Sequence, residues 1–159
     1  MKNFAQRGFT ILELMITVLM LGVMLTLAVP SFSAVFKQNR LAAQTNSLLS
    51  SLNYARGQTI NQNQIVIVQP ITAGTDWSAG WKVRVNGVDI QFFEGVENAS
   101  LISTAATITY QSDGTLTTGA NVTLTLTLTP NDCPTGSSDV RVITITLSGQ
   151  SSSTTAVCT

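Results

Sequence analysis

An acidic side chain stands inside the most apolar stretch of this sequence. Residues 9–29 read FTILELMITVLMLGVMLTLAV, and Glu13 is their one charged residue. A carboxylate inside a membrane helix is costly and is rarely present without a partner or a purpose. Glu13 is therefore the first candidate functional residue.

Cys133 and Cys158, the two cysteines, lie near the carboxyl end. In an exported chain the simplest interpretation is one disulfide, which would close a loop of roughly 25 residues and contribute on the order of 3 kcal/mol. Two buried free thiols are an alternative that suits a cytosolic protein better. A thiol nucleophile is a weaker one, since the sequence has no histidine to activate it.

The other polar residues give little support to an enzyme. Without histidine, the sequence excludes histidine acid-base catalysis and His-ligated metal sites. The carboxylates fall on expected turns and strand ends, where solvated surface is the default interpretation; they are Asp76, Asp89, Glu94, Glu97, Asp113, Asp132 and Asp139. A paired acid-base dyad stays a weak alternative. We predict no enzymatic activity and no cofactor.

The charge balance argues against broad nucleic-acid binding. The chain has eight basic and eight acidic residues, and removal of Lys2 and Arg7 with a leader would leave six basic residues against the eight acidic ones. Nucleic-acid binding requires Lys and Arg gathered on one face. A local basic patch stays open as an alternative.

The apolar stretch is long enough to cross a bilayer. At 1.5 Å per residue, residues 9–29 span roughly 30 Å, the thickness of the hydrocarbon layer. The preceding residues 1–8, MKNFAQRG, are basic, so this end should stay cytoplasmic while the rest is exported. A signal peptide, a plain anchor and a type IV prepilin are the three interpretations. Neither of the first two explains Glu13.

The segment RGFTILE resembles the type IV prepilin signature, with Gly8, Phe9 and Glu13 at the family's spacing. The resemblance implies that a prepilin peptidase cuts after Gly8 and methylates the new amino terminus of Phe9. Glu13 would then pair with the terminal ammonium of a neighbouring subunit and set the register of assembly. An ordinary anchor with a snorkelling Glu13 is the alternative. Pro30 is expected to kink the helix, as in pilins, rather than stop it.

The next segment has helical periodicity. Residues 30–61 are expected to continue the helix as an amphipathic half that ends near Gly57 and the following Asn-Gln cluster. Its apolar residues are Phe32, Val35, Phe36, Leu41, Leu48, Leu49, Leu52 and Ile60. We favour a solvated or filament-facing surface for Lys37, Arg40 and Arg56.

Residues 64–159 are expected to form a β-rich head, because alternation and Val, Ile and Thr favour strands. The expected strands are 65–69, 81–85, 88–93, 107–111, 122–129, 140–147 and 154–158, with residues 148–155 mostly a loop. Asn86-Gly87 predicts a type I′ hairpin turn. Alternating Leu and Thr at 123–129 predicts a half-buried strand. The predicted fold is α+β, a long helix packed on one small antiparallel sheet.

A second resemblance covers nearly the whole chain. The pattern Asp-Trp-x-x-Gly-Trp-x-Val at residues 76–83, the later Thr107, Tyr110 and Gly114, and the strand VRVITITLSG after Cys133 resemble the FimT, FimU and GspH group of minor pilins. For Trp77 and Trp81 themselves, burial under the helix is favoured over a ligand-stacking pair.

This resemblance implies three functions: priming and capping of type IV pili, capping of a type II secretion pseudopilus, or DNA binding during transformation. We favour the first, a minor pilin that nucleates pilus assembly with other minor pilins near the tip, and hold the secretion pseudopilin second. DNA-binding members carry basic residues after the last turn's glycine, whereas Gln150 follows Gly149 here. DNA binding through Lys37, Arg40, Arg56 and Arg141 is therefore not favoured. The expected partners are prepilin peptidase, other minor pilins, the major pilin and the assembly platform. The expected location is the bacterial inner membrane, crossed once, with the head in the periplasm, and then the pilus or pseudopilus.

Overall fold

The computed structural model describes residues 8–117 and 123–159, without the side chains of residues 27–31. The chain forms two compact units, residues 1–39 and residues 40–159. Helix α1 spans Ile11–Gln62 and belongs to both units. It continues through position 30, so Pro30 does not stop the helix. The predicted kink at Pro30 stays a prediction. Residues 1–7 of the predicted leader lie outside the described residues.

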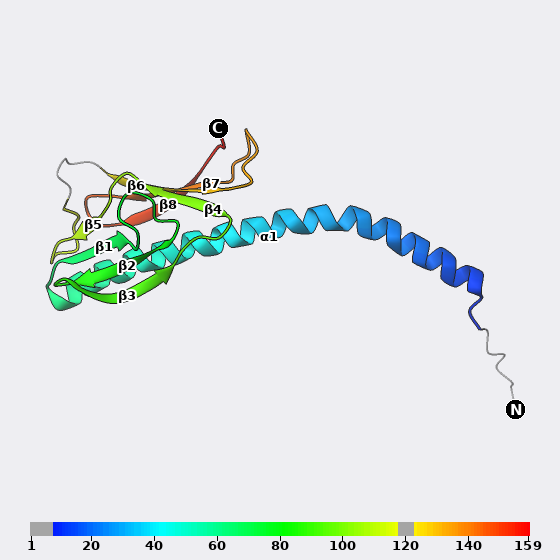
Figure 1. Ribbon diagram of the computed structural model, residues 1–159, viewed down its shortest axis with the longest axis horizontal. Helices are drawn as coiled ribbons and strands as arrows, with labels where there is room; N and C mark the ends of the chain where they lie inside the picture. The colour runs from blue at the N-terminus through cyan, green and yellow to red at the C-terminus, as the bar shows by residue number, and fades with distance from the viewer. Residues whose placement is uncertain (1–7, 118–122) are drawn as a thin grey trace, which may run out of the picture. The chain divides into compact units, whose positions relative to one another are not determined.

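In the second unit, α1 packs one side onto the strands (Figure 1). Leu41, Leu48, Leu52 and Ala55 are buried at helical spacing. Thr45, Ser51 and Thr59 on this side are also buried. Their hydroxyls donate to helix carbonyls 2.7–3.0 Å away, so burial leaves none of these hydroxyls without a hydrogen bond.

Not every apolar residue predicted for the amphipathic half shares this buried side. Phe32, Val35 and Phe36 are 53–71% exposed, and Ile60 is 54% exposed. The apolar residues of α1 that belong to the hydrophobic core begin at Leu41, within the second unit.

Helix α1 ends later than Gly57. Asn63 has a left-handed φ of 52°, and the Gln64 N–H donates to the Thr59 carbonyl at 3.3 Å. This is the bonding of a Schellman-type helix end with Asn in the position usually held by Gly. The predicted Asn-Gln cluster therefore does mark the end, while Gly57 lies within the helix.

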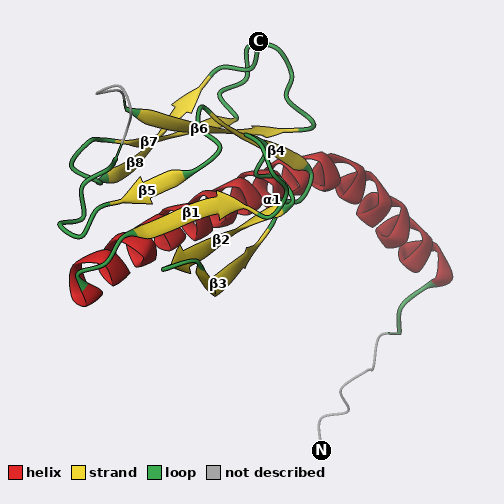
Figure 2. Cartoon of the chain, turned by 60° about the vertical axis from the view of Figure 1, so that its left-hand side comes forward, coloured by secondary structure: helices red, strands yellow, loops and turns green. Residues whose placement is uncertain are grey.

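The described strands form two antiparallel four-stranded sheets, in the orders β3-β2-β1-β5 and β4-β6-β7-β8 (Figure 2). Their bounds are β1 Val66–Pro70, β2 Gly80–Val85, β3 Val88–Glu94, β4 Ala99–Ser103, β5 Ile108–Tyr110, β6 Leu124–Pro130, β7 Val140–Ile145 and β8 Ser151–Ala156. The α+β class is confirmed. The single small sheet expected from the sequence is instead two sheets.

Two strands differ from the sequence prediction. Strand β4 was missed because it is short and only Leu101 and Ser103 are buried. Strand β8 overlaps the strand expected at 154–158 but begins three residues earlier, on residues read as a loop, since Ser and Thr signal turns in a sequence. The whole of Ser151–Ala156 pairs with Ile145–Val140, so backbone hydrogen bonding holds this strand with little help from its side chains.

Local predictions in the sheets were accurate. Asn86 and Gly87 have φ of 50° and 80°, as a type I′ turn requires, and join β2 to β3. In β6, Leu126 and Leu128 are buried while the intervening threonines are half-buried. The hydrophobic core is formed by apolar side chains of α1 and of both sheets, together with Trp77 and Trp81.

Candidate functional site

The first turn of α1 contains the residues predicted to matter for processing and assembly. Gly8 and Phe9 are exposed, and the Glu13 N–H donates to Thr10 Oγ1 at 3.2 Å. The Leu14 N–H donates to the Thr10 carbonyl at 3.2 Å, so Thr10 is the N-cap and Glu13 the third helical residue. A carboxylate is favourable here because the helix dipole is positive at this end. The sequence analysis missed Thr10, although Thr-x-x-Glu is the signature of a capping box.

The helix after this turn presents apolar side chains on all sides. Every large apolar residue from Phe9 to Leu25 is 52–82% exposed. The hydroxyls of Thr17 and Thr26 donate to helix carbonyls at 2.8 and 2.7 Å, which satisfies them without water. Soluble monomers rarely expose so large an apolar surface. The arrangement suits a segment that is covered by other helices or by lipid.

Within the described residues, no helix combines the length and the apolar character that a membrane crossing requires. Residues 27–29, the end of the predicted membrane segment, are among those without described side chains.

The four basic residues proposed for DNA do not form one cluster. Arg40 and Arg56 are 16 residues apart on α1, about 24 Å along its axis. Arg141 lies on β7, in a pocket of about 210 Å³ that Thr45 and β8 also line. Lys37 belongs to the other unit of the chain. The structure therefore gives no support to a single basic patch made by these residues.

Arg56 is not the solvated surface residue expected from the sequence. It is half-buried, and its guanidinium donates to the carbonyls of Gly114 at 3.1 Å and Ser148 at 2.8 Å. These carbonyls belong to turns next to β5 and after β7, so one side chain ties both sheets to α1. Its charge serves the fold, which explains why a surface prediction based on neighbouring polar residues failed.

Two glycines allow the approach of these turns. Gly114 and Gly149 have φ of 79° and 77°, which favours glycine. A Cβ on Gly149 would also overlap the Gly114 carbonyl oxygen. The turn glycine recognised in the sequence is therefore required for sheet packing beside Arg56.

The two tryptophans are buried, as predicted. Trp81 is 1% exposed, donates its indole N–H to Ser51 Oγ at 2.7 Å, and stacks on Phe93 with ring centroids 6.0 Å apart. Trp77 is fully buried. Gly80 between them has a φ of 116°, and a Cβ there would lie 2.6 Å from the Phe93 carbonyl oxygen. The tryptophan motif is thus a packing element of the core.

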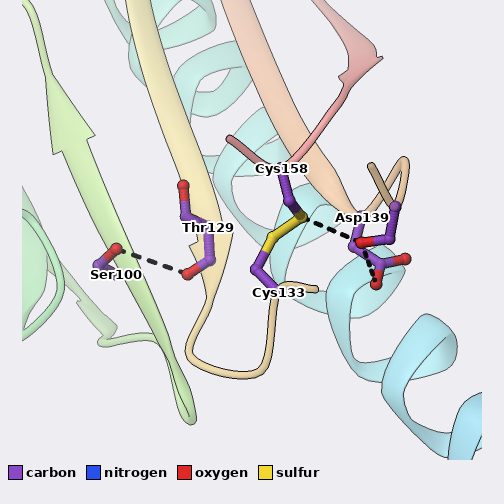
Figure 3. Close-up of a disulfide and its surroundings, with 6 residues drawn as sticks. Ser100, Thr129, Cys133, Asp139 and Cys158 are labelled. Carbon is purple, nitrogen blue, oxygen red and sulfur yellow. Dashed lines mark hydrogen bonds between the residues drawn. A yellow bond between two sulfur atoms is a disulfide. The ribbon is translucent and has the colours of Figure 1, made fainter. Parts of the chain in front are cut away.

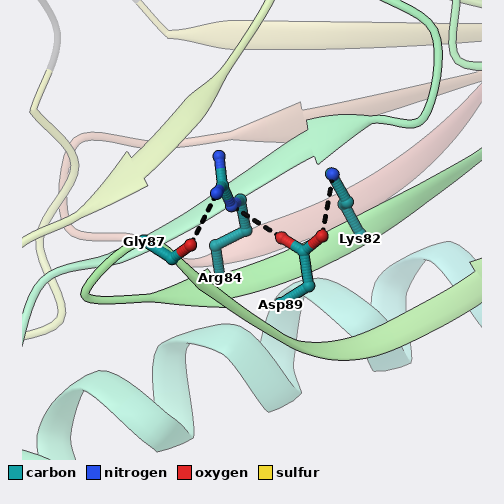
Figure 4. Close-up of polar contacts among 4 residues, drawn as sticks. All are labelled: Lys82, Arg84, Gly87 and Asp89. Carbon is teal, nitrogen blue, oxygen red and sulfur yellow. Dashed lines mark hydrogen bonds and ion pairs between the residues drawn. The ribbon is translucent and has the colours of Figure 1, made fainter.

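The acidic residues with resolved contacts stabilise turns and strands. Asp89 contacts Lys82 Nζ at 2.9 Å and Arg84 Nε at 2.6 Å across the β2–β3 hairpin (Figure 4). The hydrogen bond from Lys82 lowers the pKa of Asp89, as hydrogen bonds within turns do for the pKa of Asp76 and Asp113. A carboxyl group that acts as a general acid near neutral pH needs a pKa raised toward that pH, whereas the pKa of each of these three aspartates is lowered. Over residues 8–117 and 123–159, no acidic or cysteine side chains gather as a metal site.

A disulfide joins Cys133 to Cys158 (Figure 3), with Cα atoms 5.7 Å apart. The predicted pairing is therefore confirmed. The Gly136 N–H donates to the Cys158 carbonyl at 3.0 Å, and the Cys158 N–H donates to the Ser137 carbonyl at 2.8 Å. The bond fastens the carboxyl terminus, beyond β8, to the loop between β6 and β7.

Comparisons with known proteins agree with this fold. The family model described as type II transport protein GspH matches residues 44–150, and that of the prokaryotic N-terminal methylation motif matches residues 3–29. One crystal structure of the type IV minor pilin FimU of Pseudomonas aeruginosa strain PAO1 has a TM-score of 0.60 and 21% identity, covering 72% of this chain and 87% of that chain. A second crystal form gives a TM-score of 0.58 and 20% identity, covering 71% and 91%.

Proposed function

The chain belongs to the GspH family of type II transport proteins, and from this premise we propose that it is a FimU-like minor pilin of a type IV pilus. In this role it assembles with other minor pilins and the major pilin, and primes or caps the filament. Motility, adhesion or DNA uptake by the pilus then depends on it indirectly.

The observation that carries the proposal is the uncovered apolar part of α1. The large apolar side chains from Phe9 to Leu25, and again Phe32, Val35 and Phe36, are more than half exposed. A bundle of such helices in a filament core, or lipid before assembly, would cover them. The compact unit that follows, residues 40–159, has its own core and forms the head.

Processing at Gly8 is the second part of the proposal. Gly8 has no positive φ, and a Cβ added to it would meet nothing within 4 Å. The folded chain therefore has no need of glycine here, in contrast to Gly149. Recognition by a prepilin peptidase, which cuts after Gly8 and methylates Phe9, accounts for this glycine.

Glu13 has two roles in the proposal. Its position in the first turn favours a carboxylate through the helix dipole. In the filament the same carboxylate accepts the terminal ammonium of Phe9 from a neighbouring subunit, an ion pair strengthened by the low dielectric of packed helices. The second role sets the axial register of the subunits.

We place the precursor in the bacterial inner membrane with residues 9–29 as its single span and the head in the periplasm. The Cys133–Cys158 disulfide supports an oxidising compartment for the head. The assembly platform in the same membrane is the partner that incorporates the subunit.

DNA reception is not part of the proposed function. Gln150 follows the turn glycine, and Arg56 is occupied by two carbonyls of the fold. Gel shifts at two salt concentrations test this. Real phosphate contacts to DNA must weaken as salt rises, so a DNA affinity that does not change with salt would agree with the absence of a DNA-receiving role.

A secretion pseudopilin is the second candidate, favoured by the description of the matching family as a type II transport protein. Pilus and pseudopilus subunits are processed in the same way, so the phenotype of a gene deletion is what separates the two candidates. We expect deletion of the gene to abolish twitching and to leave type II export intact, with rescue by the wild-type gene. Lost export with intact twitching would favour the second candidate.

Replacement of Glu13 by Gln tests the assembly mechanism. We expect normal cleavage and methylation of Phe9 by mass spectrometry, and at least a fivefold loss from sheared filaments. Thr10→Ala is the matched control, because it removes the cap of α1 and keeps the carboxylate. Wild-type incorporation of E13Q, or an equal loss in T10A, would contradict the ion-pair role.

A further inference from the structure

Strand β8 is an unusual edge strand. It lies at the end of the sheet β4-β6-β7-β8, and its sequence SSSTTA carries no charge and no proline. Its four central residues are exposed. Proteins usually protect sheet edges with charges, proline, bulges or covering segments, because an open edge invites another strand.

The other described sheet edges have such protection. Strand β3 carries Asp89 and Glu94 and is irregular opposite Val83 and Arg84. Strand β4 is covered by residues 75–78: Trp77 N–H donates to its Leu101 carbonyl at 2.8 Å, for example. Strand β5 is covered by residues 115–117, whose Thr117 N–H donates to the Thr109 carbonyl at 2.9 Å.

The register shows which groups of β8 are open. At the hairpin base the Thr146 N–H donates to the Gln150 carbonyl at 2.9 Å. Antiparallel pairs alternate, so Ser152, Thr154 and Ala156 direct their backbone groups toward β7. The backbone groups of Ser151, Ser153 and Thr155 point away from it. Within residues 8–117 and 123–159, no backbone hydrogen bond from a turn or loop reaches these outward groups.

A pocket lies beside this edge. It measures about 210 Å³ and lies between Ala42, Thr45 and Asn46 of α1 and the short side chains of residues 153–155. Arg141 lines it from β7, where it pairs with Thr155. A side chain of an added strand that points toward α1 would enter this pocket.

We propose that β8 accepts the edge strand of a neighbouring pilin head. The inference rests on the proposed function. The six small residues of β8, five of them polar, bury little apolar area, so their pairing with a free peptide would be weak. In a filament, the packed helices of the subunits hold neighbouring heads at high effective concentration. A weak contact between two strands is then sufficient to keep the heads paired. A tethered pilin head therefore fits the edge better than a soluble ligand.

Crosslinking in cells that assemble filaments tests this pairing. A benzoylphenylalanine replaces Ser152, and crosslinked chains are identified by mass spectrometry. Ser153→Pro removes one outward N–H and no bond to β7, whereas Ser153→Ala keeps that N–H. We expect a crosslink to a chain with the N-terminal methylation motif, reduced at least fivefold by S153P and unchanged by S153A.

The controls separate this inference from the proposed function. The Cys133–Cys158 bond and protease resistance should be intact in S153P, and a further variant, Thr155→Pro, removes the next outward N–H. A crosslink that survives both proline variants, or that forms with a chain of another class, overturns the pairing. Sheared filaments that contain this chain without the crosslink refute the inference alone; absence of the chain from filaments refutes both.

Discussion

Reduction of the Cys133–Cys158 disulfide should lower the stability of the head by an amount that the structure sets. The bond closes a loop with a sequence separation of 25, and in the chain-entropy model this contributes about 3.5 kcal/mol at 25 °C. The loop contains β7 and β8. Reduction leaves the backbone bonds of Cys158 in place, so we expect the same fold with lower stability.

The assay is thermal unfolding of the full chain in detergent, followed by near-ultraviolet circular dichroism of the buried Trp77 and Trp81. At about 4 °C per kcal/mol for a domain of this size, reduction should lower the midpoint by about 14 °C. The double variant Cys133→Ala, Cys158→Ala is the control. Its midpoint should lie near that of the reduced wild type and should not respond to reductant.

A reduction shift below about 4 °C, less than a third of the expected value, would refute this reasoning. It would mean that the reduced unfolded chain keeps the ends of the loop close together, so that the bond removes little entropy. A shift of the double variant with reductant would show that the reagent acts elsewhere.

Three further changes test other parts of the structure. Gly149→Ala should lower the free energy of unfolding by about 2–4 kcal/mol in urea titrations, because its Cβ overlaps the Gly114 carbonyl at a positive φ; a loss below 1 kcal/mol would contradict the close packing. Ser51→Ala should cost about 1–3 kcal/mol in the same titrations, since it leaves the buried Trp81 N–H unpaired, and Ser51→Thr should restore part of it. Asp89→Asn should destabilise the head at neutral pH, and this difference should vanish as the pH falls through the lowered pKa of Asp89; a difference that persists in acid would exclude the charge as its cause.

The sequence predictions were most accurate where a structure depends on residues close together in the sequence. The Asn86-Gly87 turn and the Leu-Thr alternation of β6 depend on adjacent residues, and both were confirmed. The disulfide was also predicted, because the chain offers a single pair of cysteines. The capping role of Thr10 was available from its spacing to Glu13 and was overlooked.

The failures concern residues whose surroundings come from distant parts of the chain. Ser151–Ala156 has the composition of a loop, and only its pairing with β7 makes it a strand. Arg56 looked like a surface residue, since the two carbonyls that bind it lie 58 and 92 positions away in the sequence.

The sequence by itself determined the amino-terminal half of α1 and the residues proposed for processing, Gly8, Phe9 and Glu13, because apolar length and short spacings are local properties. The tertiary structure alone decided that the strands form two sheets, that Arg56 joins them to the helix and that β8 is the open edge. Each of these depends on which strands become neighbours, and that choice is made by long-range burial of side chains around α1, which no local pattern records.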